Sequence, residues 1–131
     1  LEFADQNACR FYKKIAYDDE YGGGALDNDE GSRIAHAMGN NDVLFMANHG
    51  ITVAGTNVAH AWEQLYFLNR ACQAQVLAMS TGRPLKKIPE HTVRSVAKEI
   101  ETAESGVTAS YHRHFAALKR LLEPEQPNYR C

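Results

Sequence analysis

The sequence has few cysteines, no long hydrophobic run and almost no net charge. Its three cysteines, Cys9, Cys72 and Cys131, are too few and too widely spaced to predict a disulfide framework or a Cys-x-x-Cys metal site. No apolar run approaches the roughly 20 residues of a membrane span, and no secretory signal pattern opens the chain. A formal charge of −2 provides no attraction to nucleic acid or membranes. We therefore expect a cytoplasmic protein with neither of these partners.

The length and composition are sufficient for one domain. The chain has 131 residues, of which 44% are hydrophobic, and this supports a real core. It begins at Leu1 rather than at methionine. This start is consistent with a fragment, a processed product or an engineered piece, and composition does not distinguish among them.

The chain is organised around residues 42–82, where we predict strand, turn, strand and long helix. Two β-rich runs, near 42–47 and 51–55, flank the polar break Asn48-His49-Gly50. The first run is continuously apolar, as in a strand covered on both faces, and the second is β-branched. The short link predicts an antiparallel pair. Gly50 is expected to let the backbone reverse without a Cβ clash, which leaves His49 at the tip.

A helix of about seven turns is predicted over 57–81. Thr56 or Asn57 can cap its first amides, and Gly82 follows its end. Apolar positions recur at helical spacing and predict one buried stripe, formed by Ala61, Leu65, Leu68, Cys72, Val76 and Met79. Trp62 and Tyr66 lie on another face, so we expect this helix to make contacts on more than one side.

Four further helices are predicted from spacing and capping signals. They cover residues 2–15, 29–38, 89–104 and 107–123. Asp27 or Asp29 is expected to cap the second of these, and Gly39 to end it. Between the first two lies an acidic loop with three glycines, 22–24. No lysine follows these glycines, so we interpret the segment as a chain reversal near the site rather than a phosphate-binding loop.

His49 is the first candidate for a functional side chain. A neutral imidazole suits zinc, and an open catalytic zinc site needs two further protein ligands and a water. Asn48 can fix the turn, Gly50 permits it, and the flanking strands provide rigid support. These residues predict a metal ligand at position 49.

Other titratable residues fit ordinary roles better. His112 and His114 form an H-x-H pair, but positions i and i+2 on a helix point about 200° apart, so we expect solvated side chains. The acidic residues of 18–19 and 27–30 raise a glycosidase-like alternative, which helix capping and solvation explain better. His36 and His60 are expected to be surface polar residues, although His60 could approach a site.

Several motifs together resemble the class II aldolase/adducin head family. They are Asn48-His49-Gly50, Tyr17–Asp19 with Tyr21-Gly22, Asp29–Gly31 with Arg33–Ala35, Gly55, and Arg70–Gln75. The match runs over about residues 1–85. It implies an α/β fold of three-layer α/β/α type with a mixed or antiparallel central sheet, of which this chain is the C-terminal half. We expect one partial domain over 1–131, with its core in 1–85 and a helical extension in 86–131.

The resemblance also implies a function. In the family an N-H-G turn supplies one of three histidine zinc ligands, here His49, and the metal stabilises an enediolate. The implied activity is a lyase or epimerase acting on a small hydroxy-carbonyl, sugar-phosphate-like substrate. The family uses a tyrosine as proton donor, for which Tyr17, Tyr21 and Tyr111 are candidates. Family members commonly form homo-oligomers, often tetramers.

The chain departs from the family pattern in two respects. Catalytic members carry an H-x-H pair with a preceding carboxylate earlier in the domain, and nothing before Leu1 is present to supply it. Asn69 stands where related sequences often carry glutamate, which would weaken support of the metal from a second shell. We therefore expect zinc to be absent or only partly occupied in this chain. The alternative is a non-catalytic, adducin-like interaction or scaffold domain.

Overall fold

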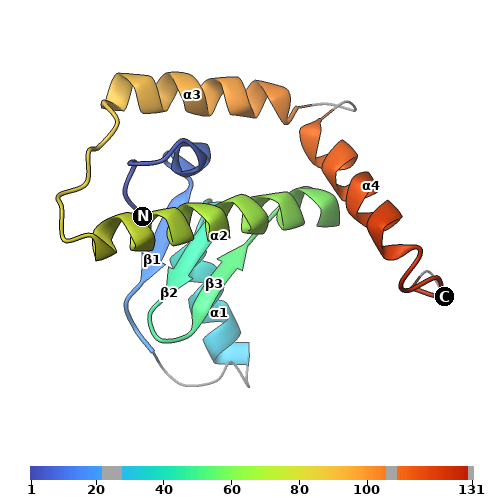
Figure 1. Ribbon diagram of the computed structural model, residues 1–131. Helices are drawn as coiled ribbons and strands as arrows, with labels where there is room; N and C mark the ends of the chain where they lie inside the picture. The colour runs from blue at the N-terminus through green and yellow to red at the C-terminus, as the bar shows by residue number, and fades with distance from the viewer. Residues whose placement is uncertain (22–27, 106–108, 130–131) are drawn as a thin grey trace. The chain divides into compact units, whose positions relative to one another are not determined.

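The computed structural model describes residues 1–21, 28–105 and 109–129. Within them the chain forms two compact units, one comprising Phe11–Ala54 and the other Leu1–Arg10 with Gly55–Cys131. The elements of both units are shown in Figure 1. The three glycines 22–24, Asp27 and Val107 lie outside the described residues, so the expectations for them are not addressed by the structure.

A three-stranded mixed sheet forms the centre of the Phe11–Ala54 unit. Its strands are β1 (Ile15–Asp18), β2 (Val43–Met46) and β3 (Gly50–Val53), in the order β1-β2-β3. β1 runs parallel to β2, and β3 runs antiparallel to it, with Phe45 opposite Ile51. The predicted strands, their antiparallel connection and the mixed sheet are confirmed. Val43 and Leu44 are fully buried, as the continuous apolar run indicated.

Helix α1 (Asn28–Met38) connects the two parallel strands and contacts both. It confirms the helix predicted over 29–38. Its C-terminus is closed by Gly39, which adopts φ +55° and donates its N–H to the Ala35 carbonyl at 3.1 Å. This left-handed conformation is the one that favours glycine. Asp29 lies within the first turn rather than at the cap.

The helix predicted over residues 2–15 is wrong. The segment contains only a short 3-10 helix, η1 (Asn7–Phe11), followed by strand β1. Lys13 adopts φ +58°, which breaks any continuing helix, and the Phe3 carbonyl accepts a hydrogen bond from the Ile88 amide at 2.7 Å. Apolar spacing of three or four residues fits one turn of either helix type. β1 forms by pairing with a distant strand, which local periodicity does not reveal.

The longest element is α2 (Val58–Ser80), which confirms the helix predicted over 57–81. Asn57 caps it, because its side-chain oxygen accepts the His60 amide at 3.0 Å, and Gly82 follows the end with φ +70°. Gly55 packs tightly against its first turn. A Cβ at this position would lie 2.5 Å from the Ala61 nitrogen.

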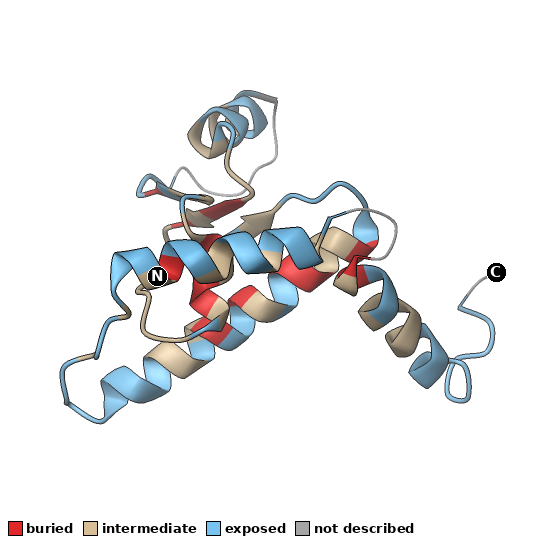
Figure 2. Ribbon diagram, turned by 90° about the horizontal axis from the view of Figure 1, so that it is seen from above, coloured by how far each residue is buried: buried red, intermediate tan, exposed pale blue. Residues whose placement is uncertain are grey.

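The buried face of α2 differs from the predicted stripe. Of that stripe only Leu68 is buried, whereas Leu65, Val76 and Met79 are exposed. The buried residues of the helix are Ala59, Glu63, Gln64, Leu68 and Ala71. Figure 2 shows burial concentrated in the N-terminal part of the helix. The buried face of α2 includes the carboxylate of Glu63. Tertiary contacts therefore decide which face of this helix is buried, and the spacing of apolar residues does not predict it.

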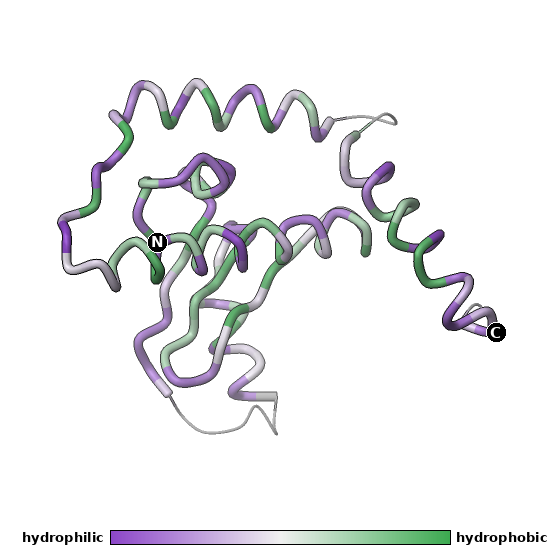
Figure 3. Tube along the Cα trace, viewed as in Figure 1, coloured by the Kyte–Doolittle hydropathy of each residue, from purple (hydrophilic) through white to green (hydrophobic). Residues whose placement is uncertain are grey.

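The unit of Leu1–Arg10 with Gly55–Cys131 contains α2 and two further helices. They are α3 (Glu90–Ala103) and α4 (Ser110–Leu122). They confirm the helices predicted over 89–104 and 107–123, with Pro89 at the N-terminus of α3. α4 contacts α2, and Ala59, Ala109 and Tyr111 form a small buried cluster with Phe115 against it. Hydrophobic positions recur along α4 (Figure 3). Among the described helices, none is both long and apolar enough to cross a membrane.

Candidate metal-ligand site

His49 lies in the tight turn that joins β2 to β3. Its amide donates to the Met46 carbonyl at 3.2 Å, and its side chain is exposed. Asn48 occupies the left-handed region with φ +58°, a conformation that asparagine tolerates better than most residues. The structure therefore places His49 in the turn that the sequence predicted, on a rigid support of paired strands.

Gly50 has the role in the turn that was expected of it. It adopts φ +141°, a conformation that residues with a side chain rarely adopt because the Cβ would crowd the adjacent backbone. Beyond its chain neighbours, a Cβ at this position would meet none of the described residues within 4 Å, so the need for glycine is local. Asn48 and Gly50 thus shape the turn through their backbone conformations.

The end of strand β1 is bonded to this turn. The Asp18 carbonyl accepts the Ala47 amide at 2.8 Å, one residue beyond the ladder of β1 and β2. The Asp18 side chain is only 5% exposed, and its Oδ1 accepts the Glu20 amide at 3.2 Å. Asp18 therefore fixes both the start of the His49 turn and the chain that leads to Tyr21.

Arg33 of α1 joins two carboxylates beside the turn. Its Nη1 donates to Asp18 Oδ1 at 2.8 Å, while Nε and Nη2 donate to the two oxygens of Glu30, each at 2.8 Å. These hydrogen bonds hold the pKa values of Asp18 and Glu30 below their usual range and raise that of Arg33. The charge of His49 also contributes to lowering the Glu30 pKa, although less than Arg33 does. Sequence analysis missed this ion-pair group.

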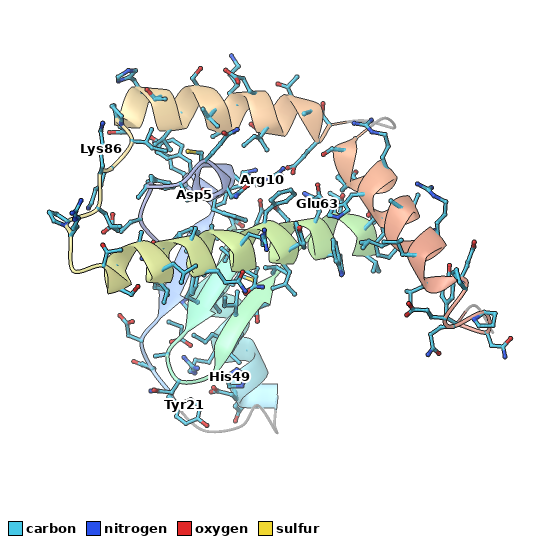
Figure 4. The ribbon with its side chains drawn as sticks, in the orientation of Figure 1. Asp5, Arg10, Tyr21, His49, Glu63 and Lys86 are labelled. Atoms are coloured by element: carbon cyan, nitrogen blue, oxygen red, sulfur yellow. The ribbon has the colours of Figure 1, made fainter. Side chains whose placement is uncertain are left out.

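Among the three candidate tyrosines, Tyr21 has a ring contact with His49. The two ring centroids are 6.3 Å apart, and the Tyr21 side chain is about half exposed (Figure 4). Tyr17 stacks on Phe45 at 5.5 Å. Tyr111 is buried in the other unit, with its ring 4.9 Å from that of His60. The geometry brings Tyr21 and His49 together, whereas Tyr111 is buried.

The described residues do not form a complete zinc site. Zinc in a catalytic site takes three protein ligands, and no group of three or more His, Cys, Asp or Glu side chains suitable for a metal occurs in the described part of the chain. Glu30, the carboxylate that interacts with His49, has both oxygens bound by Arg33. By itself, the described chain therefore offers His49 as a single ligand and does not fit the whole ion.

The H-x-H histidines belong to α4 in the other unit. His112 is exposed on α4, as expected for the H-x-H pair. His114 is not simply solvated. It contacts the Glu63 carboxylate of α2, and its ring meets Trp62 edge-on at 4.9 Å. Glu63 is buried, and sequence analysis missed this pair because the two residues are far apart along the chain.

The structure also places the other polar residues that the sequence analysis considered. His36 is exposed, and His60 takes part in the start of α2, where its Nδ1 accepts the Thr56 amide at 3.2 Å. Asn69 is exposed on α2. Asp18 and Glu30 share one arginine rather than facing each other across an open cleft, which gives no support to a glycosidase-like pair.

Comparison with known proteins is consistent with the motifs. Residues 1–76 match the family described as Class II Aldolase and Adducin N-terminal domain. A protein of Caulobacter vibrioides assigned to the class 2 aldolases is 39% identical over 96 residues, covering 72% of this chain and 37% of that protein. The decarboxylase NovR of Streptomyces niveus is 31% identical over 129 residues, covering 94% and 47%. The chain thus spans less than half the length of these curated relatives.

Solved structures share the fold. An aldolase II superfamily protein from Pseudomonas syringae matches with a TM-score of 0.81 and 33% identity, over 97% of this chain and 49% of that protein. L-fuculose 1-phosphate aldolase from Glaciozyma antarctica matches with a TM-score of 0.72 over 95% and 46% of the two chains, and its 24% identity shows the fold alone. These likenesses confirm the predicted α/β fold class. The chain belongs to the class II aldolase and adducin N-terminal domain family.

Proposed function

We propose that this chain contributes the C-terminal half of a metal-dependent lyase or epimerase domain. The substrate would be a small hydroxy-carbonyl compound of the sugar-phosphate type, and His49 would be one of three histidine ligands to zinc. The observation that carries the proposal is the exposed His49 ring on a turn held by two paired strands. A catalytic member of the family needs a rigid imidazole at this turn, and this chain supplies one.

The residues around His49 suit such a site. When bound, zinc would supply a positive charge that stabilises an enediolate. His49 would hold its ring toward the ion, because paired strands and the Ala47–Asp18 hydrogen bond restrain its backbone. Tyr21 lies beside this ring with part of its side chain in solvent, where it can donate a proton to a bound substrate.

The name of one relative supports carbon–carbon bond cleavage rather than scaffolding. NovR, 31% identical to this chain, is named a decarboxylase. Decarboxylation breaks a carbon–carbon bond and leaves an electron pair that must be stabilised. We therefore favour a lyase over a scaffold as the function of this chain.

A non-catalytic, adducin-like interaction domain is the second candidate. It is favoured by the single ligand among the described residues and by the exposed amide of Asn69. Under either function we propose a cytoplasmic homo-oligomer, such as the tetramers that the family resemblance implies. We propose no nucleic-acid or membrane partner for it.

A chimera separates these two functions. This chain would be joined to the half of the Pseudomonas syringae protein that it does not cover, so that the domain is complete. We expect the chimera to bind stoichiometric zinc and to cleave a hydroxy-carbonyl substrate, whereas the chain alone does neither. A folded chimera that binds no metal would favour the scaffold.

A further inference from the structure

Three segments of the Phe11–Ala54 unit meet around His49. They are the end of β1, the first turn of α1 and the turn between β2 and β3. Each contributes one charged or bonded residue, namely Asp18, Glu30 and Ala47. Arg33 is the side chain that links the first two segments, and Asp18 links the first to the third.

Arg33 makes these links in a way that few side chains can reproduce. Its planar guanidinium spans both oxygens of Glu30 and still reaches Asp18, with all three donor–acceptor distances at 2.8 Å. A lysine ammonium is a point charge that cannot bridge two carboxylates with the same geometry. The arrangement therefore depends on arginine at this position rather than on positive charge alone.

Because Asp18 is buried, loss of its ion pair with Arg33 would affect the structure. Its side chain is 5% exposed, whereas that of Arg33 is 31% exposed. Without Arg33, the carboxylate would be buried with no charged partner, and such a group moves toward water or takes up a proton. Because the same residue holds the Ala47 and Glu20 amides, its movement would displace both the His49 turn and the chain at Tyr21.

We propose that Arg33 is a positioning residue for the His49 site. By bridging Asp18 and Glu30, it sets the placement of the Tyr21 ring against the His49 ring. The inference rests on the proposed function for its catalytic meaning, but the arrangement itself is a property of this chain. A residue that only stabilised the fold would leave that ring contact intact in the molecules that remain folded.

The test measures nuclear Overhauser effects between the Tyr21 and His49 rings in the 131-residue chain. Centroids 6.3 Å apart bring ring protons within range of this effect. We expect the cross-peaks in the wild type, their loss in Arg33→Gln and weakened cross-peaks in Arg33→Lys. The matched control is Lys14→Gln, which removes a 3.8 Å ion pair to Asp42 at the other end of the same two strands. It should retain the cross-peaks.

Two outcomes would overturn the proposal. One is retention of the cross-peaks in folded Arg33→Gln, and the other is their equal loss in the Lys14→Gln control. If Arg33→Gln does not fold, Glu30→Gln provides the second variant. It removes one arm of the bridge, leaves the pair of Arg33 with Asp18, and should weaken the cross-peaks. Unchanged cross-peaks in Glu30→Gln would then count against a bridging role.

A zinc measurement on the chimera separates this inference from the proposed function. If both hold, Arg33→Gln lowers zinc affinity about 10- to 100-fold, as loss of a group that orients a metal ligand typically does. The Lys14→Gln control leaves that affinity unchanged. Loss of the ring cross-peaks with unaltered zinc affinity would uphold the positioning role and contradict His49 as a ligand.

Discussion

Asp18 and Glu30 make the unit that carries His49 sensitive to acid. Hydrogen bonds from Arg33 lower both pKa values in the folded state from their usual values of 3.8 and 4.5. A lowered pKa stabilises the folded state fully at pH values above the unfolded-state pKa. This contribution is lost as pH falls through the lower folded-state values. The unit should therefore keep its stability from neutral pH to about pH 5 and lose it below about pH 4.

This pH dependence can be measured by hydrogen exchange at the Ala47 amide, which donates to the Asp18 carbonyl. We expect protection to be constant above about pH 5, after correction for intrinsic exchange, and to fall in more acidic solution. Arg33→Gln should abolish the lowering of the two pKa values, so that protection is weaker at neutral pH and changes little as the solution becomes acidic. An identical acid profile in wild type and variant would show that these carboxylates do not govern the unit.

At the residue scale, sequence analysis succeeded where the relevant partners are local. It placed His49 at the turn tip and offered Asn57, with Thr56 as the alternative, as the cap of the long helix, because both roles depend on neighbouring residues. It missed Arg33 with Asp18, and His114 with Glu63, because folding brings these partners together across 15 and 51 positions. Nothing in a single sequence identifies such pairs.

At the scale of elements, the junction before α2 requires glycine. A Cβ on residue 55 would lie 2.5 Å from the Ala61 nitrogen, which is backbone and cannot move aside easily. We expect Gly55→Ala to lower the free energy of unfolding by about 1–3 kcal/mol, the usual cost of overpacking. Urea unfolding followed by Trp62 fluorescence, at the start of the same helix, measures this change.

Gly31→Ala is the matched control for that substitution. Gly31 lies within α1, and a Cβ there would meet nothing within 4 Å. Alanine is favoured over glycine by roughly 0.5–1 kcal/mol inside a helix, so this variant should be neutral or more stable. Equal destabilisation by both variants would mean that the close approach to Ala61 does not decide the effect at residue 55.

The elements themselves were predicted unevenly. The long helix and the two strands around His49 follow from periodicity, β-branched residues and capping signals. The wrong helix at residues 2–15 shows what periodicity cannot distinguish. A 3-10 turn and an amphipathic helix share the same short apolar spacing. β1 becomes a strand through pairing with β2, about 28 positions further along the chain. The buried face of α2 was likewise decided by tertiary contacts.

At the scale of the whole molecule, exposed apolar surface predicts self-association. Val76, Leu77 and Met79 are more than half exposed on α2, and β1 and β3 are the edge strands of the described sheet. Such surfaces and edges favour contacts with further chains. We expect sedimentation to show concentration-dependent association of the chain, reduced by the double substitution Val76→Lys and Leu77→Lys.

The control for association is Val58→Lys, which also removes an exposed apolar side chain of α2 but at its opposite end. It should leave association unchanged if the C-terminal part of the helix is responsible. A clean 14.6 kDa species with cooperative unfolding at all concentrations would contradict the prediction. That result would mean that the exposed surface is tolerated by a stable monomer.

The family and the fold class were accessible from motifs spread along the first 85 residues, and both are confirmed. The substrate was not, because the chain spans less than half of its curated relatives and offers one candidate ligand. When the ligands of a metal come from both halves of a domain, the sequence of one half cannot identify the complete site. Only a resemblance to whole family members then indicates it. The catalytic account therefore depends most on the role of His49.

Replacement of His49 by alanine in the chimera tests that role most directly. Bound zinc and melting temperature would be measured in the same preparations. Because an exposed turn histidine buries little apolar area, we expect loss of nearly all bound zinc with little change in melting temperature. Retained zinc together with a collapsed melting temperature would show that His49 is structural, and would contradict its assignment as a metal ligand.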